Sequence, residues 1–256
     1  MRNGQREGYA VRARRVVACA AAAWIVALVA GCAPVFQACP PGTTAPLAAE
    51  KPENGWWYAS FQFRWPEGEE PSLHTDLIVA HRIAAPILAR HNSEIPLWRF
   101  HRRAARDEAG HRFSLILYCP PKTARRVFAA IDSSIVLEDM KTAGLVLKVR
   151  FDDASKVFRP GVEDVSDKSW SKPLQKSWPY FIMGVSETWL DLIDRFANDG
   201  RPKPFTLEGT VEFYRGIDAA VRETWAKEGA HAFLHHLNAL FGYGPVTVYG
   251  KHQMRF

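Results

Sequence analysis

The sequence predicts an α+β protein, with a ferredoxin-like β-α-β-β-α-β sheet half at residues 55–153 and a mainly helical half at residues 154–256. Two observations predict this class. In the first half, four segments with the alternation of strands and two with the spacing of helices follow one another in the order of a split β-α-β unit. In the second half, three further segments have helical spacing. The composition, 47% hydrophobic and 23% charged, is that of a globular protein.

The elements of the sheet half follow from local patterns. Alternation predicts strands at residues 56–65, 96–104, 111–119 and 143–152, the second and third of which form a hairpin. Helical spacing predicts a helix over residues 74–91, with Ser72 as its N-cap and a bend at Pro86. A second helix opens at Pro120-Pro121-Lys122 and stops near Ser133.

The second half begins with an irregular stretch, residues 154–177. Helices are expected at about 179–198, 206–228 and 230–241, with Gly229 as a break between the last two. A short apolar strand is expected at residues 246–249.

The N-terminus has the pattern of an export signal. Five arginines and one acid in residues 1–15 precede an uncharged apolar run at residues 16–30, which is shorter than a membrane-spanning helix. The run ends in Leu28-Val29-Ala30-Gly31-Cys32. This ending resembles the lipobox of bacterial lipoproteins.

The resemblance implies that residues 1–31 are removed and that Cys32 is acylated, including with palmitate, which anchors the chain to a membrane. Ala33, in place of an aspartate, favours the periplasmic face of the outer membrane over the inner membrane. An ordinary signal peptide with a chance cysteine is the rival interpretation. Without residues 1–31 the formal net charge falls from +6 to +2.

Residues 32–54 contain five prolines and no periodicity, which predicts a semi-extended tether. Export places Cys39 and Cys119 in an oxidising compartment. Two alternatives remain open: the two cysteines pair, or Cys119 is buried on its strand and Cys39 is free or paired differently.

Strand alternation assigns the two faces of the predicted sheet. We expect the inner face, which includes Leu147, to be covered by the two helices. The outer face includes Trp56 and Val146 and is basic with interleaved aromatic residues. Its candidate ligand-binding residues are Tyr58, Arg64, Arg99, His101, Arg103, Lys148 and Arg150.

Export argues against nucleic acid as the ligand of this face, so an anionic lipid, a glycan or an envelope protein is the expected partner. The alternative is that the helical half covers the face. In that arrangement Glu187, Asp191 and Asp194, which share one helix face, would meet the arginines.

No catalytic or dinucleotide-binding motif occurs in the chain. We therefore expect a binding or assembly module rather than an enzyme, with no cofactor. The alternative is an envelope enzyme or metal-binding protein that uses Glu228, His231 and His235, because two histidines four residues apart on a helix can chelate one ion.

Overall fold

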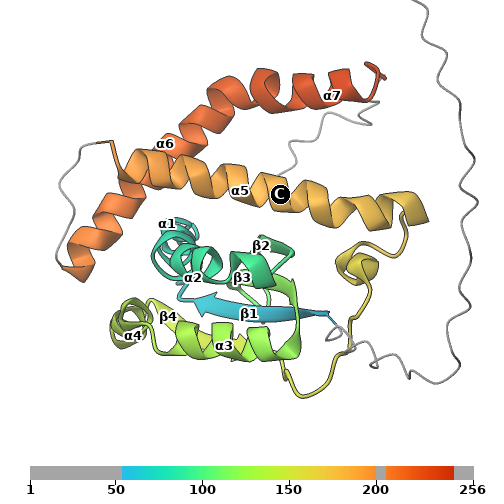
Figure 1. Cartoon of the computed structure of the whole chain (residues 1–256). Coiled ribbons are helices and arrows are strands. Elements are labelled where there is room, and N and C mark those ends of the chain that lie inside the picture. The colour runs from blue at the N-terminus through green and yellow to red at the C-terminus, as the bar shows by residue number, and fades with distance from the viewer. Residues whose placement is uncertain (1–53, 200–205, 245–256) are drawn as a thin grey trace, which may run out of the picture. The chain divides into compact units, whose positions relative to one another are not determined.

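A computed structural model describes residues 54–199 and 206–244, all of which belong to the second of two units of the chain, residues 49–256. The α+β class is confirmed. A four-stranded antiparallel sheet has the strand order β2-β3-β1-β4 (Figure 1). Its strands are β1 (Gly55–Phe63), β2 (Leu97–Ala104), β3 (His111–Cys119) and β4 (Val146–Phe151). The expected strand at residues 246–249 lies outside the described residues.

The register of β4 contains an irregularity that reverses part of the predicted face assignment. Gln62 of β1 pairs with Lys148, but the next residue, Phe63, pairs with Val146. Val146 therefore joins the inner face and is buried, whereas Leu147 is 60% exposed. The prediction that Leu147 points inward and Val146 outward was wrong, because strict alternation fails wherever a strand carries an extra residue.

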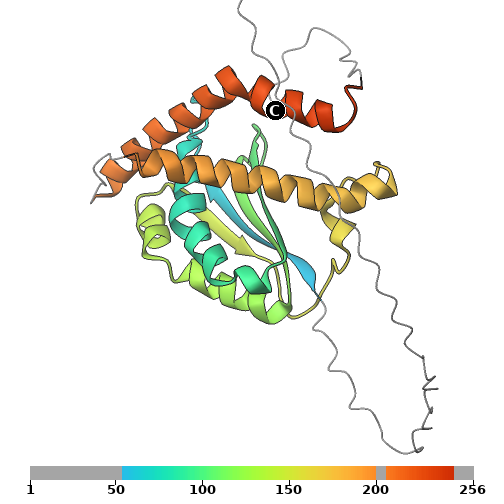
Figure 2. The same ribbon diagram turned by 45° about the horizontal axis from the view of Figure 1, so that its top comes forward.

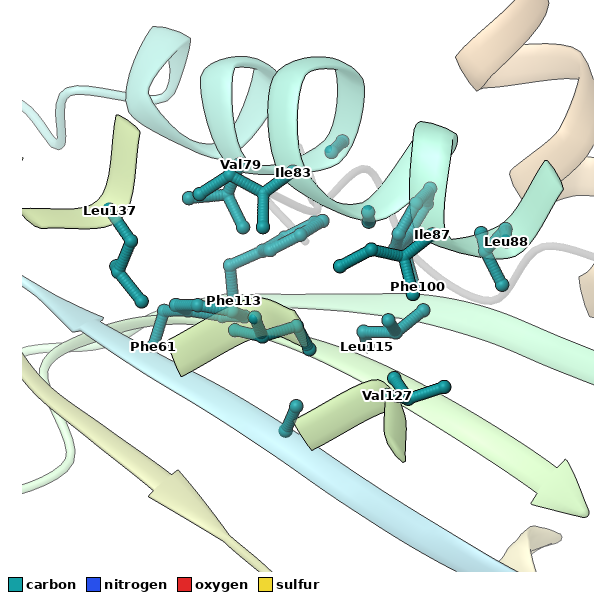
Figure 3. Close-up of a cluster of buried hydrophobic side chains, with 14 of the residues drawn as sticks. Phe61, Val79, Ile83, Ile87, Leu88, Phe100, Phe113, Leu115, Val127 and Leu137 are labelled. Atoms are coloured by element: carbon teal, nitrogen blue, oxygen red, sulfur yellow. The ribbon is translucent and has the colours of Figure 1, made fainter. Parts of the chain in front are cut away.

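Helices cover the inner face of the sheet. They are α1 (His74–Ile78), η1 (Val79–Ala84), α2 (Ala85–Arg90), α3 (Pro121–Asp132) and α4 (Ile135–Thr142), with a short 3-10 turn, η2, at Asn92–Glu94. Figure 3 shows Val79, Ile83 and Ile87 above Phe61, Phe113 and Leu115 of the sheet. Apolar side chains at helical spacing thus pack against alternating apolar side chains of the strands, and the burial of both sets forms the main core.

The first helix differs from the prediction at both its start and its bend. Its N-cap is Leu73 rather than Ser72. The backbone carbonyl of Ser72 instead accepts a hydrogen bond from the hydroxyl of Thr75 at 2.6 Å. Pro86 cannot donate a helical hydrogen bond, and the wider π-helical turn η1 lies directly before α2. Pro86 thus marks an irregularity, as expected.

Helix α5 (Lys172–Ala197) starts seven residues before the predicted beginning at residue 179. Pro179, the first residue of the predicted range, lies inside the helix, where it leaves the carbonyl of Gln175 without its usual N–H donor. The hydroxyl of Ser166 donates to that carbonyl at 2.6 Å. A hydrogen bond from outside the helix therefore compensates for the proline. Ser166 follows the 3-10 turn η3 (Val162–Val165).

Helix α5 crosses the edge strand β2 from one face of the sheet to the other. Met183 packs against the cluster around Trp56 on the outer face, and Trp189 stacks edge-on against Phe100 of the inner face at 5.6 Å between centroids. Between them, the Ser186 hydroxyl accepts a hydrogen bond at 3.1 Å from the backbone N–H of Phe100, a residue of the edge strand β2. The edge of the sheet is thereby covered by a helix.

The last helices form one continuous run. Helix α6 (Leu207–Gly229) packs on α1 and α5 and passes directly into the π-helical turn η4 (Ala230–His235) and α7 (His236–Leu240). Beyond α6 this run lies on the other side of α5 from the sheet (Figure 2). The predicted break at Gly229 was wrong. The ring of Trp225 lies against Gly229, where an added Cβ would come within 2.6 Å of it, so the glycine makes room for this ring.

Candidate ligand-binding face of the sheet

Two rows of polar side chains cross the outer face of the sheet. In the first row, His101 of β2 lies opposite Ser114, which lies opposite Ser60, which lies opposite Arg150 of β4. In the second row the corresponding residues are Arg103, Arg112, Gln62 and Lys148. We call the six basic residues of this region the basic face: Arg99, His101, Arg103, Arg112, Lys148 and Arg150.

The basic face has two cationic flanks and a polar centre that contains a single arginine. The flanks lie on β2 and β4, the two edges of the four-stranded sheet, so three strand spacings, about 14 Å, separate them. The centre contains hydroxyl and amide groups, and the Ser60 and Ser114 hydroxyls are hydrogen bonded at 3.0 Å. Among the six residues of the basic face, Arg112 is the one that lies between the flanks. A ligand that contacts both flanks must therefore carry several separated negative charges.

Most cations of this face have no acidic partner among the described residues. Lys148 and Arg150 are exposed, Arg112 is half-buried, and none of the three forms an ion pair within residues 54–199 and 206–244. Arg103 is the exception, because both of its terminal nitrogens contact the carboxylate of Asp107, which raises the pKa of Arg103. The uncompensated charge lies mainly at Arg99, Arg112, Lys148 and Arg150.

Arg99 is a half-buried cation without a carboxylate in the described structure. Burial is the main cause that lowers its pKa, and the neighbouring hydroxyl of Tyr58 acts in the opposite direction. Its Nε atom is buried and has no hydrogen-bond partner in the described residues. Removing a charge from water without a counter-ion is unfavourable, so this guanidinium is suited to receive an anion.

The pKa of His101 is lowered by burial and in part by the positive charges of this face. Partial burial is the first cause that lowers its pKa, and the charges of Arg99 and Arg103 lower it further. The imidazole is therefore neutral at neutral pH and can donate one hydrogen bond to a ligand without adding charge.

One end of the outer face is closed. Trp56, Leu97 and Ile116 form a buried cluster there, under residues 160–165 and Met183. The Trp56 indole donates to the carbonyls of Gly161 at 3.1 Å and Val162 at 3.0 Å. Tyr58 lies at the boundary, with the Arg159 guanidinium 4.3 Å from its ring centroid. Trp56 is therefore part of the core, whereas Tyr58 borders the open region.

The described helices leave the rest of this face open. Helix α5 packs along β2, and α6 packs on α1 and α5, which leaves His101, Lys148 and Arg150 exposed. Arg64, also exposed, follows β1 and donates its backbone N–H to the carbonyl of Leu145.

The three acidic residues of α5 do not meet the basic face. Glu187, Asp191 and Asp194 line a groove of about 340 Å³ beside His81 and Trp98. His81 Nε2 lies 3.1 Å from Asp194, and its Nδ1 lies 2.6 Å from the hydroxyl of Tyr214 on α6. Pairing of these acids with the arginines, the alternative left open by the sequence, is not found.

A buried polar cluster at the opposite side of the sheet was not predicted. Asp76 of α1 has no exposed surface and lies between Arg102 and His111, at 2.7 Å and 2.9 Å. Arg102 also lies 4.0 Å from Asp218 of α6. The cluster joins the sheet to the helical half. Single sequence patterns do not reveal it, because its members come from four different elements.

Arg112 is the one member of the basic face that the sequence analysis did not name. It lies two residues before Ser114 on the same strand, so strand alternation puts both residues on the same face of the sheet. The predicted lipidation site Cys32, and the tether with Cys39, lie outside the described residues. Cys119 is buried, which raises the pKa of its thiol to about 12.

The histidines of the metal-binding alternative lie on η4. The rings of His231 and His235 are stacked with centroids 5.3 Å apart, whereas Glu228 is exposed near the end of α6. Within the described part of the chain, no three His, Cys, Asp or Glu side chains are already arranged to hold a metal ion.

Comparison of the chain with protein-family models, with curated proteins and with solved structures found no match. The interpretation of the basic face therefore rests on the chain's own residues. None of the described helices is long and apolar enough to cross a membrane.

Proposed function

We propose that this chain is a lipoprotein of the bacterial cell envelope, anchored by acyl chains on Cys32, whose sheet binds a polyanionic envelope ligand through the basic face. The protein acts as a binding or assembly module at the periplasmic face of the outer membrane. Its ligand presents several phosphates or carboxylates, as do anionic lipid head groups and acidic glycans.

The observation that carries this proposal is Arg99, a half-buried guanidinium whose Nε has no partner and which has no carboxylate among the described residues. Arg112, Lys148 and Arg150 extend the same uncompensated charge across the sheet. A bound polyanion, with one negative group near each flank, would supply the missing counter-charge to all four. Cationic side chains near an anionic surface each contribute about 1 kcal/mol to binding.

The two-flank arrangement favours a polyanion over a single phosphate. A lone phosphate on Lys148 cannot also contact the β2 flank, about 14 Å away. An array of head groups or a glycan chain can contact both. The tether at residues 32–54 can span about 70 Å when fully extended, which allows the face to reach the surface of the anchoring membrane.

The sheet half is proposed to be ferredoxin-like. The strand order β2-β3-β1-β4, with helical connections after β1 and β3 and a hairpin between β2 and β3, supports this assignment. In this topology both helical connections pack on one face, which leaves the other available for a ligand.

Anchoring is tested by labelling cells with radioactive palmitate. The parent chain is expected to take up the label, and Cys32→Ser is expected to lose it. Cys39→Ser serves as the matched control and should remain labelled. Labelling that persists in Cys32→Ser contradicts acylation at this residue.

Ligand class is tested with the full lipidated chain held in phosphatidylcholine nanodiscs. The discs are passed over immobilised heparin, over a bilayer that contains phosphatidylglycerol, and over a phosphatidylcholine bilayer. Selective binding to the second surface identifies a lipid ligand, and binding to the first identifies an acidic glycan. Equal binding to all three surfaces, or to none, contradicts the proposed function.

A further inference from the structure

Three imidazole rings gather where η4 meets α7. The ring centroids of His231 and His235 are 5.3 Å apart, those of His231 and His236 are 5.5 Å apart, and those of His235 and His236 are 5.2 Å apart. All three residues are exposed. The rings therefore form a nearly equilateral triangle on the surface, remote from the sheet.

The π-helical turn explains why three rings meet rather than two. On a regular α-helix, residues four apart share a face, but a residue five positions on lies about 140° around the axis. A π-helical turn closes hydrogen bonds between residues five apart, so both the fourth and the fifth residue lie over the first. In η4, which spans Ala230–His235, this places both His235 and His236 beside His231.

The spacing of the rings matches a tetrahedral metal site. A metal–nitrogen distance of about 2.1 Å and a tetrahedral angle place the centroids of two ligating imidazoles about 5.2 Å apart. The three separations found here lie within a few tenths of an ångström of that value. The ring positions are thus suitable, while the ring orientations are not yet convergent.

Rotation of exposed rings can complete the site. The rings of His231 and His235 are nearly parallel, at 9°, and as they stand the three histidines do not form a metal-holding group in the described structure. The terminal torsion of a histidine has a broad minimum, and solvent-exposed rings meet little steric resistance to turning. The ring of Tyr243, whose centroid lies 5.8 Å from that of His235, borders this rotation on one side.

We propose that His231, His235 and His236 bind one divalent transition-metal ion that prefers imidazole ligands, such as Zn²⁺ or Cu²⁺. Water occupies the remaining position, because the triangle is open to solvent. Glu228 is not part of this ligand set. The site is independent of the basic face, so either can fail without affecting the other.

The test titrates Zn²⁺ into the full lipidated chain in detergent micelles, after removal of metal, in competition with a chromophoric chelator. One ion per chain is expected. Each of His231→Ala, His235→Ala and His236→Ala is expected to weaken binding at least about tenfold. His101→Ala, an exposed histidine on the sheet, and Glu228→Gln are the matched controls and should bind as the parent does.

Cu²⁺ electron paramagnetic resonance supplies a second readout. Coupling to three equivalent nitrogens is expected in the parent and to two in each single histidine variant. Absence of saturable binding overturns the proposal. Parent-like binding by His236→Ala also overturns it, because a chelate of His231 and His235 alone would then account for the affinity.

Discussion

The Nε of Arg102 lies 2.7 Å from a carboxylate oxygen of Asp76, a side chain with no exposed surface. The other oxygen lies 2.9 Å from His111 Nε2. One carboxylate on the first helix thus contacts side chains from two strands: it accepts a hydrogen bond from Arg102, whereas the close approach to His111 does not have hydrogen-bond geometry. Arg102 in turn approaches Asp218 of α6. A buried charge in such a position is costly to leave without its partners.

Asp76→Asn is expected to lower the free energy of unfolding by about 3 kcal/mol, because it leaves Arg102 with only the more distant carboxylate of Asp218 as a counter-charge. The loss stays at the lower end of the range for buried pairs, since the Arg102 side chain is 31% exposed. Asp191→Asn breaks an exposed pair with Arg195 and should cost less than about 1 kcal/mol. Denaturant unfolding followed by circular dichroism measures both. Equal losses of unfolding free energy in the two variants would contradict a larger contribution of the buried cluster to stability.

Ser186→Ala is expected to weaken the contact between helix α5 and the edge strand β2. The substitution removes the acceptor of the Phe100 N–H and should cost about 1–2 kcal/mol. Hydrogen exchange of the Phe100 amide is expected to accelerate relative to amides that pair with β3. Thr188→Ala removes a hydroxyl that bonds only within its own helix and serves as the control. Unchanged protection of Phe100 in Ser186→Ala would contradict this role.

The pKa of His101 is expected to lie below its ordinary value of 6.5, as measured by NMR titration of the imidazole. Arg99→Gln removes a neighbouring positive charge and should raise that pKa, whereas Arg90→Gln, on the distant helix α2, should leave it unchanged. A ligand anion bound to the basic face should raise it as well. A His101 pKa that does not respond to Arg99→Gln would contradict the positive potential of this face.

The same depressed pKa sets the direction of a pH effect on stability. His101 and the buried His74 both have a pKa lowered from 6.5 in the folded protein, with burial as the first cause. Their contribution to the folding stability is therefore complete above pH 6.5. It is lost as the pH falls through the pKa values of the two histidines in the folded protein. The midpoint of thermal unfolding is expected to decrease from pH 7 to pH 5 through these two groups, and less so in His74→Gln.

Strand and helix patterns predicted the sheet half well where an element obeys a single period, but they missed helix α4 and the irregular register of β4. The strands at residues 97–104 and 111–119 were found within a residue of their predicted bounds. The errors fall where a distant contact overrides a local rule. Pro179 indicates a helix start by itself, but Ser166 from outside the helix satisfies the freed carbonyl.

Part of the candidate site was predictable because the regular alternation of the strands places its residues on one face. Alternation alone gathered Arg99, His101, Arg103, Lys148 and Arg150 on one face, and their exposure or partial burial there agrees with it. It could not show that Asp107 neutralises Arg103, because that pairing depends on the conformation of the hairpin loop. Nor could it show the irregular register that exposes Leu147.

The most direct test of the basic face compares two triple variants of equal charge. Arg112→Ala/Lys148→Ala/Arg150→Ala removes three unpaired cations from the face, and Arg90→Ala/Lys122→Ala/Lys176→Ala removes three exposed cations elsewhere. In phosphatidylcholine nanodiscs, the first variant should bind its preferred anionic surface roughly 100-fold more weakly than the parent. The second should bind within a few-fold of the parent. Equal weakening of both variants, or parent-like binding by the first, would contradict the account.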